Sequence, residues 1–550
     1  MRFPFKTSWK AIILKTTSVL NESALPKTLS VSAQYDGISH TDISIQAFGD
    51  LLAHHPELPA CHFGELSVTR AELSAGASNS ANYLSSLGFT SGDVLAVWLP
   101  DSPAWLQLLF AAASLGVIVV PISTRYKVAE ANHVIDQSRA KGLVIAAEFL
   151  DYDYQSAAAS LKSSNSTLEH IICVDINAGL MSDDAVAHPS AVTAAIQLPL
   201  ITFSTSGTTG HPKLALHTQL GIAKHALNVS RVLEVRAGDV MLCALPLYGV
   251  LGFGQALAAI AAGAACVLMP VFKGEDAAQA IERHGVTHSF GSDGLFERIF
   301  DTTQYSLASW RRGGFTEFAG LGQAICKKAE QDLNLLLTGL YGMSECLAIA
   351  ATRYPQDDPR VRALGGGSPV SPEIRLRVID GDTGLEVAEG DQGELQITGY
   401  NIMSGYLHNE AASAGAFTAD GWFKTGDLVR RTADGFIYLA RLNDGMRLGG
   451  YLVDPSEIER FLTQHEGVLG AQVVAVKKQG TGDVAVAFVI STDTELSEEK
   501  LLAYCKAGIA NYKVPKRIVF VSEFPEKPGP NGVKILKTKL REMAAAELSV

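Results

Sequence analysis

The chain has 550 residues, of which 47% are hydrophobic and 19% charged, the balance of a globular protein with roughly two to four domains. Its formal net charge of −12 argues against a nucleic-acid or anionic-membrane surface, because both need clustered Lys and Arg. The seven cysteines are dispersed with no Cys-x-x-Cys pair, so we expect buried thiols in a reducing compartment rather than disulfides or a zinc site.

Residues 1–42 are predicted to be an amino-terminal extension. Basic residues come before any acidic one and alternate with apolar side chains, for example Lys10 before Ile12 and Ile13. The segment is therefore either poorly ordered or a transit-like or interfacial sequence; its apolar part is too short for a secretory signal. We expect a cytoplasmic protein, with organellar or membrane-peripheral targeting as the alternative.

From residue 43 onward, strand-like and helix-like patterns alternate, which predicts an α/β fold with largely parallel sheets. Two long apolar stretches, 104–121 and 256–270, contain Gly and end at Pro, which suits a buried helix followed by a strand better than a membrane span. Helices are expected at Leu73–Leu87, Ala104–Leu115, Val134–Arg139, Ala223–Leu233 and around Leu257, and strands at Asp93–Leu99, Val117–Pro121, Leu143–Ala146, Ile171–Val174, Leu198–Phe203, Leu214–Thr218, Val240–Leu245, Ala265–Met269 and Leu333–Leu337.

The sequence pattern changes at Gly366, where short strand-like runs separated by turn signals predict a β subdomain. We place a domain boundary near residue 442, giving a large domain over 43–442 and a small α+β domain over 443–550. Strands are expected at Arg375–Ile379, Gly393–Thr398, Phe436–Ala440, Gly470–Val476, Val484–Ile490 and Arg517–Val521, and helices at Pro455–Gln464 and Glu498–Ile509.

A loop rich in hydroxyls and glycine connects two of the expected strands, at residues 204–213. Glycines free the backbone to turn its N–H groups inward, hydroxyls add donors, and a lysine adds positive charge, so the loop is predicted to cradle a polyphosphate. A polar hairpin tip is the structural alternative. The residues assigned to nucleotide binding here are Thr205, Ser206, Gly207, Thr208, Thr209, Gly210 and Lys213.

Two later segments supply partners for such a loop. The segment 340–345 offers the Tyr341 ring for adenine, the permissive Gly342, the Ser344 hydroxyl and the Glu345 carboxylate, which could hold Mg²⁺ against phosphates. A helix-start cap is the alternative for this segment. Further on, Asp427 could accept both hydroxyls of a ribose, although an Asp in an ordinary turn would look the same.

These segments resemble, in order along 43–545, the motifs of the adenylate-forming superfamily: acyl- and aryl-CoA synthetases, peptide-synthetase adenylation domains and luciferase. The resemblance implies ATP-dependent conversion of a carboxylic acid to an acyl-adenylate, then thioester formation with coenzyme A. It implies ATP, Mg²⁺ and coenzyme A as ligands, and a fatty, aryl or alicyclic acid as substrate. It also implies that Gly320 lies in the nucleotide site and that Arg441 contacts the ribose and phosphate bound by Asp427.

The resemblance extends to the moving parts of the family. It implies an interdomain hinge at Asn443, a coenzyme A tunnel beside Gly449 and Gly450, and a catalytic lysine at Lys534, with Lys537 and Lys539 as solvated helix charges. Lys213, Ser344 and Glu345 complete the expected catalytic set. The chain departs from the usual pattern at Leu214, Gly249, Asn443 and Val533.

The segment 244–255 resembles the part of the family that forms the acid pocket, and we assign Tyr248, Gly249, Phe253 and Met343 to it. Glycine at 249 either deepens the pocket or serves chain packing. No Asp lies between Leu245 and Gln255 to hold an amino acid's ammonium, so an uncharged, mainly apolar acid is favoured.

Two alternatives concern the acceptor and the activity. The chain ends at Val550 with no carrier domain, which favours coenzyme A over a carrier protein supplied in trans, although a carrier-loading ligase is the second hypothesis. A nucleotide-binding homologue without catalysis is the third, and the departures at Leu214, Asn443 and Val533 are its support. The identity of the acid and the oligomeric state, monomer or homodimer, stay open.

Overall fold

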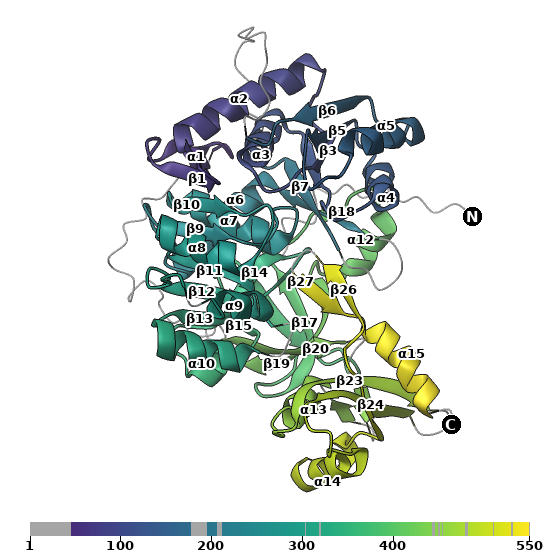
Figure 1. The fold of residues 1–550 in the computed structure, drawn as a ribbon. Coiled ribbons are helices and arrows are strands. Elements are labelled where there is room, and N and C mark those ends of the chain that lie inside the picture. Colours follow the sequence, from purple (N-terminus) through teal and green to yellow (C-terminus); the bar gives the residue numbers. More distant parts are fainter. Residues whose placement is uncertain are drawn as a thin grey trace, which may run out of the picture. The chain divides into compact units, whose positions relative to one another are not determined.

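The structure is a computed structural model, and it describes residues 46–177, 195–205, 212–302, 304–317, 321–442, 446–448, 451–453, 455–478, 482–509, 511–529 and 532–548. The expected amino-terminal extension and most of the glycine-rich loop lie outside them. Figure 1 shows the order and colours of the elements.

The larger of two major sheets in the described residues has thirteen strands. Its strands run in the order β16 (Arg375–Ile379), β17 (Gln392–Thr398), β19 (Phe423–Thr432), β20 (Gly435–Arg441), β15 (Gly366–Pro369), β14 (Leu347–Thr352), β13 (Leu336–Met343), β12 (Arg312–Thr316), β11 (His288–Ser292), β9 (Val240–Cys243), β10 (Ala265–Leu268), β1 (Pro59–Phe63) and β2 (Leu66–Thr69). From β13 through β1 the pairs are parallel, and from β14 to β16 they are antiparallel. The antiparallel part is the β-rich region predicted after Gly366.

The second sheet has seven strands and carries the polar loop at one of its hairpins. Its order is β18 (Gly405–Tyr406), β8 (Leu214–Thr218), β7 (Pro199–Ser204), β4 (Ile118–Pro121), β3 (Val94–Trp98), β5 (Gly142–Ala146) and β6 (His170–Val174). β7 and β8 pair antiparallel, so the loop does connect two extended segments, as predicted.

The helices that accompany these sheets follow the apolar patterns closely. They are α1 (Asp50–Ala53), α2 (Arg70–Ser86), α3 (Pro103–Leu115), α4 (Val128–Ser138), α5 (Tyr154–Ser164), α6 (Gln219–Val232), α7 (Val250–Ala262), α8 (Gly274–His284), α9 (Asp293–Phe300), α10 (Gly322–Leu333), α11 (Pro359–Arg362) and α12 (Glu410–Ala416). Of these, α6 contacts strands of both sheets, β8 and β14, and α7 packs on α6 and on β14. Helix α6 therefore adjoins both sheets, and α7 lies between α6 and the larger sheet.

Helix α3 shows why an apolar stretch suited to a membrane span folds as a core helix instead. The Ser102 side chain caps it by accepting from Trp105 N–H, Pro103 occupies its first turn, and Gly116 ends it with φ 71°. Its residues from 103 to 113 are buried. Among the described residues, we find no helix with the length and hydrophobicity to cross a bilayer.

The last hundred residues have hydrophobic clusters of their own, built around buried residues such as Leu462, Val473 and Phe488. The elements are β21 (Met446–Leu448), β22 (Tyr451–Val453), α13 (Pro455–Leu462), β23 (Val468–Lys478), β24 (Gly482–Ser491), α14 (Glu498–Gly508), β25 (Arg517–Phe520), β26 (Glu526–Gly529), β27 (Gly532–Ile535) and α15 (Lys537–Leu548). The predicted α/β class is thus observed, and the boundary near 442 stays a prediction.

Two expectations are wrong. The strand expected from Leu333 starts later, because α10 continues to Leu333, Asn334 ends it in a left-handed conformation, and β13 begins only at Leu336. The helix-start alternative for 340–345 is also wrong, since that segment ends β13 and turns into β14. In addition, one cysteine, Cys173 on strand β6, is exposed, whereas the other six are buried.

Candidate active site

The two ends of the glycine-rich loop are fastened to each other. Thr205 N–H donates to the carbonyl of Lys213 at 2.8 Å, and Lys213 N–H donates to the Thr205 hydroxyl at 3.3 Å. The half-buried Lys213 places its Nζ 4.4 Å from the centre of the Tyr406 ring. The departure at Leu214 has a packing reason, because this side chain is fully buried in the second hydrophobic core. Ser206, Gly207, Thr208, Thr209 and Gly210 lie outside the described residues.

The segment 341–345 lies beside this loop. The Ser344 hydroxyl donates to the carbonyl of Ser204, the last residue of β7, at 3.3 Å. The carbonyl of Ser344 accepts from His217 Nε2 on β8 at 2.7 Å. Burial lowers the pKa of His217 to about 4, so its ring is neutral at pH 7. These contacts join two predicted motifs that are far apart in the sequence.

Tyr406 is a further link that sequence reasoning missed. Its hydroxyl donates to Glu345 Oε1 at 2.9 Å, while its ring faces the Lys213 ammonium. The turn before Glu345 is tight: a Cβ at Gly342 would lie 2.6 Å from the carbonyl oxygen of Leu347, so only glycine fits there. Lys213, Ser344 and Glu345, which were assigned from the sequence to one catalytic set, therefore lie close together in the fold.

A second cluster, the Asp427 network, consists of Tyr341, Asp427 and Arg441. Asp427 on β19 and Arg441 on β20 are directly opposite in register, and Arg441 Nε lies 3.0 Å from Asp427 Oδ1. The Tyr341 hydroxyl donates to Asp427 Oδ2 at 2.6 Å. Asp427 therefore sits in a strand and not in an ordinary turn.

The Asp427 carboxyl is 1% exposed, and its burial raises its pKa to about 6 against the opposing effects of Arg441 and Tyr341. Arg441 faces Oδ1 as an ion pair without hydrogen-bond alignment, and among the described residues no donor hydrogen-bonds this oxygen. A buried carboxylate oxygen without a donor is costly unless a ligand supplies one. The expected adenine face, Tyr341, packs edge-on against Phe436 with ring centres 4.9 Å apart, and its stacking role stays a prediction.

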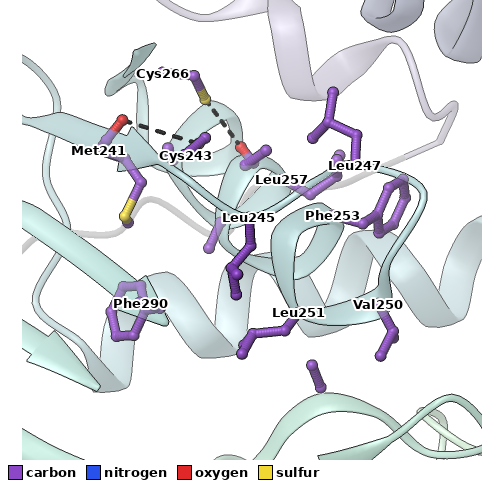
Figure 2. Close-up of a cluster of buried hydrophobic side chains, with 14 of the residues drawn as sticks. Met241, Cys243, Leu245, Leu247, Val250, Leu251, Phe253, Leu257, Cys266 and Phe290 are labelled. Atoms are coloured by element: carbon purple, nitrogen blue, oxygen red, sulfur yellow. Dashed lines mark hydrogen bonds between the residues drawn. The ribbon is translucent and has the colours of Figure 1, made fainter. Parts of the chain in front are cut away.

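The acid-pocket segment enters α7. Gly249 is the N-cap residue of this helix, with an extended backbone, and Tyr248 before it is half-buried, as is Met343 on β13. Phe253 is 1% exposed and packs on Phe203 with ring centres 5.1 Å apart. Figure 2 shows this segment, with Leu245, Leu247 and Phe253 among the apolar side chains around the start of α7.

Asp101 is a buried residue that holds the segment 244–255 in place through a hydrogen bond. It was not identified from the sequence. Its Oδ1 accepts from Leu247 N–H at 2.8 Å. The carboxyl is fully buried, which raises its pKa to about 8, so it is mainly protonated at neutral pH. It lies just before α3, about 150 residues from the loop it holds, and no local pattern marks it.

A small apolar cavity, the helix cavity, lies between α6, α7 and β14. Its walls include Ile222, His225, Phe253, Leu257 and Leu347. The free space amounts to about one water molecule. Phe253 and Leu347 place this cavity next to the predicted acid pocket and the segment 341–345.

The remaining predicted residues belong to the last hundred residues or to undescribed positions. Lys534 lies on β27 opposite Lys527, and its side chain is outside the described part. Lys537 is not simply solvated, because its Nζ lies 3.1 Å from Glu459 Oε1, whereas Lys539 is well exposed. Gly320, Asn443, Gly449 and Gly450 fall among the undescribed residues.

Comparison with known proteins gives two family matches. Residues 49–407 match the profile of the AMP-binding enzyme family, and residues 457–528 match the profile of the AMP-binding enzyme C-terminal domain. Among curated relatives, a methyl-dioxo-octahydro-indenyl propanoyl:CoA ligase of Rhodococcus jostii is 30% identical, over 88% of this chain and 96% of that protein. A mitochondrial medium-chain acyl-CoA ligase of Macaca fascicularis is 28% identical, over 88% of this chain and 84% of that one.

Solved structures share the fold. ATP-bound MatB from Rhodopseudomonas palustris has a TM-score of 0.81 at 24% identity, covering 90% of this chain and 98% of that one. The anthranilate CoA ligase AuaEII in complex with anthranoyl-AMP has a TM-score of 0.79 at 25% identity, covering 91% and 98%. These likenesses confirm the predicted α/β architecture.

Proposed function

The chain belongs to the AMP-binding enzyme family, and from that premise we propose that it activates an uncharged carboxylic acid with ATP and transfers the acyl group to coenzyme A. The curated relatives named above are CoA ligases, which supports an AMP-forming acid–thiol ligase. The observation that carries the proposal is Asp427, a buried carboxylate opposite Arg441 in register, with one oxygen that receives no hydrogen bond from the described residues. A ribose diol supplies the donor that such an oxygen lacks.

In the first half-reaction, a carboxylate oxygen of the acid attacks the α-phosphorus of ATP. The bond between this oxygen and phosphorus forms, the α–β phosphoanhydride bond breaks, and pyrophosphate leaves. Lys213 and the loop 204–213 would bind the phosphates, while Lys534 would stabilise the charge that develops between carboxylate and phosphate. Asp427 and Arg441 would hold the ribose in position.

In the second half-reaction, the thiolate of coenzyme A attacks the acyl carbon. The C–S bond forms and the C–O bond to AMP breaks, so AMP leaves and the thiol proton passes to solvent. Direct attack of the thiolate on the free carboxylate would have to expel oxide, which is a poor leaving group. AMP is a good leaving group. This is why the acid is activated first.

Mg²⁺ fits the residues beside the loop. Glu345 is a half-buried carboxylate with Oε1 already held by Tyr406, and oxygen ligands of this kind suit Mg²⁺. When bound there, the ion would neutralise phosphate charge. Its neighbours Lys213 and Ser344 would contact the same phosphate oxygens, and variants of Glu345 test this arrangement through the dependence of activity on Mg²⁺.

The proposal includes a change of domain orientation between the half-reactions. The part after Asn443 would turn about that residue, removing Lys534 and bringing the Gly449–Gly450 segment to the site for coenzyme A. A carrier protein supplied in trans is the alternative acceptor, and detection of acyl-CoA distinguishes it from coenzyme A.

The test is pyrophosphate exchange into ATP with a panel of short, long-chain, aryl and alicyclic acids. We expect exchange that depends on the added acid, and an acyl-CoA detected by mass when coenzyme A is supplied. Nucleotide binding without exchange on any acid would contradict the proposal. Exchange without acyl-CoA would retain adenylation and replace coenzyme A by another acceptor.

A further inference from the structure

One buried polar atom near the acid pocket has no role in the half-reactions above. His225 on α6 is 3% exposed, and its Nε2 lies 2.6 Å from the carbonyl oxygen of Ala348 on β14. Because a carbonyl only accepts, Nε2 carries the ring proton and donates it. The position of this proton leaves Nδ1 with a lone pair.

The His225 ring stays neutral at physiological pH. Burial lowers its pKa to about 4, and the hydrogen bond to Ala348 opposes this only in part. Nδ1 is therefore an acceptor, and among the described residues none donates to it. Leaving such a buried acceptor unpaired is unfavourable.

His225 is one wall of the helix cavity, which is otherwise lined by apolar side chains such as Phe253 and Leu347. The remaining space, about one water molecule, has the size of a hydroxyl or amino substituent rather than of a further ring or alkyl branch. Gly254, also in the wall, has room around it: a Cβ there would meet Ala348 only at 3.9 Å.

We propose that the helix cavity is the far end of the acid pocket and that His225 Nδ1 accepts a hydrogen bond from a hydroxyl or N–H group on the tail of the acid. The inference rests on the proposed acid-activating function and adds the chemistry of the tail. Since Nδ1 has no proton to give, a hydroxyl or amine suits the site and a ketone does not. His225 is thus a specificity-determining residue.

The experiment compares matched acids in pyrophosphate exchange. The probes are ω-hydroxyalkanoates of increasing length against alkanoates of the same length, and hydroxyaryl- against arylpropanoates. We expect kcat/KM to favour one hydroxylated acid by about tenfold to a hundredfold over its partner, because only that acid pairs the buried nitrogen.

Variants identify the residue responsible. His225→Leu removes the acceptor at similar volume and should abolish or invert the preference, while His225→Gln keeps an acceptor and should restore part of it. Lys224→Leu is the control, because Lys224 is the neighbouring residue on α6 and pairs with Glu373 at the surface. This control should keep the wild-type ratio.

Each outcome decides the matter. No preference in the wild-type protein, or the same preference in folded His225→Leu, would overturn the inference, as would a crystal structure with the preferred acid in which only water contacts Nδ1. If His225→Leu does not fold, the wild-type ratio and that crystal structure decide. If none of the tested acids supports pyrophosphate exchange, the proposed function itself is wrong. That result differs from exchange that occurs equally with hydroxylated and plain acids, which contradicts only the role of His225.

Discussion

The Asp427 network and the helix cavity are built in opposite ways. The Asp427 network lies on strands: the charged groups of Asp427 and Arg441 are opposite in register and 3.0 Å apart, and the Tyr341 hydroxyl lies 2.6 Å from the same carboxylate. The helix cavity lies between two helices and a strand, and its wall combines apolar side chains with His225, whose Nδ1 receives no hydrogen bond from the described residues. In the proposed function, the Asp427 network would recognise the ribose of the nucleotide through charge, whereas the helix cavity would select the tail of the acid through its shape and one acceptor.

This difference says where each kind of change should act. Substitutions in the Asp427 network should weaken binding of any nucleotide for every acid alike. Substitutions around the helix cavity should alter the choice of acid and leave the nucleotide untouched. Variants in each region should therefore show whether the two regions act separately or are coupled.

The largest effect is expected at Lys534, which in the proposed mechanism stabilises charge between the bound acid and the nucleotide. Lys534→Ala should slow adenylation by about 10²–10³, the usual loss for one charged transition-state contact, while sparing thioester formation from preformed acyl-adenylate. Single-turnover assays of each half-reaction measure this. Lys537→Ala is the control, because Lys537 is paired with Glu459; if it alone abolishes adenylation, Val533 has shifted the register.

The next effect isolates the nucleotide region. Asp427→Asn should weaken adenosine binding by about tenfold to a hundredfold, because a charge-assisted hydrogen bond contributes about 1.5–3 kcal/mol. Calorimetry with adenosine and with 2′,3′-dideoxyadenosine is the measurement. Asp427→Asn should bind adenosine and 2′,3′-dideoxyadenosine with similar affinity. If the substitution weakens binding of the dideoxy compound as much as binding of adenosine, Asp427 does not act through the ribose hydroxyls.

Gly252→Ala makes the corresponding change on the acid side. Its Cβ would lie 2.3 Å from the carbonyl oxygen of Pro246 and 2.4 Å from that of Leu245, both backbone atoms that must move. We expect overpacking to cost about 1–3 kcal/mol in the free energy of unfolding and to raise KM for the acid. Adenosine binding should not change; if it weakens equally, the two regions are coupled.

The smallest effect is a pH dependence confined to the Asp427 network. Burial raises the pKa of Asp427 from 3.8 to about 6, so the carboxyl is protonated below that pH and loses acceptor charge. Adenosine affinity should therefore be constant at neutral pH and fall by at most about tenfold between pH 6 and pH 5. Adenosine is the probe because it has no phosphate that titrates in this range.

Tyr341→Phe sharpens the same measurement. The Tyr341 hydrogen bond stabilises the ionised form of Asp427, so its removal should move the midpoint to higher pH. Asp427→Asn should show no midpoint in this range. A downward shift in Tyr341→Phe would mean that the hydroxyl does not serve the ionised carboxylate.

Much of the nucleotide region could be predicted from the sequence, because its residues lie in short motifs on strands with clear apolar patterns. Lys213, Ser344 and Glu345 were predicted and do lie together. Tyr406 was missed because its partners Lys213 and Glu345 are remote in the chain, and no local spacing marks it. The wrong strand at Leu333–Leu337 arose because the same apolar run spans the end of a helix and the start of a strand.

The residues around the predicted acid pocket were harder to predict from the sequence, for a physical reason. Its segment was recognised through Tyr248 and Phe253, but Asp101 and His225 come from other elements and act through backbone atoms of Leu247 and Ala348. Such contacts depend on how helices pack on the sheets, which the sequence pattern does not specify. Specificity is therefore the part of function that needed the structure.

The most direct test of the account follows the carboxylate oxygen. With an acid labelled by heavy oxygen in its carboxylate, and with ATP and coenzyme A, attack on the α-phosphorus must leave one labelled oxygen in AMP when the thioester forms. We predict AMP carrying one label and unlabelled pyrophosphate. Label in inorganic phosphate with release of ADP, or AMP without label, would contradict the acyl-adenylate mechanism.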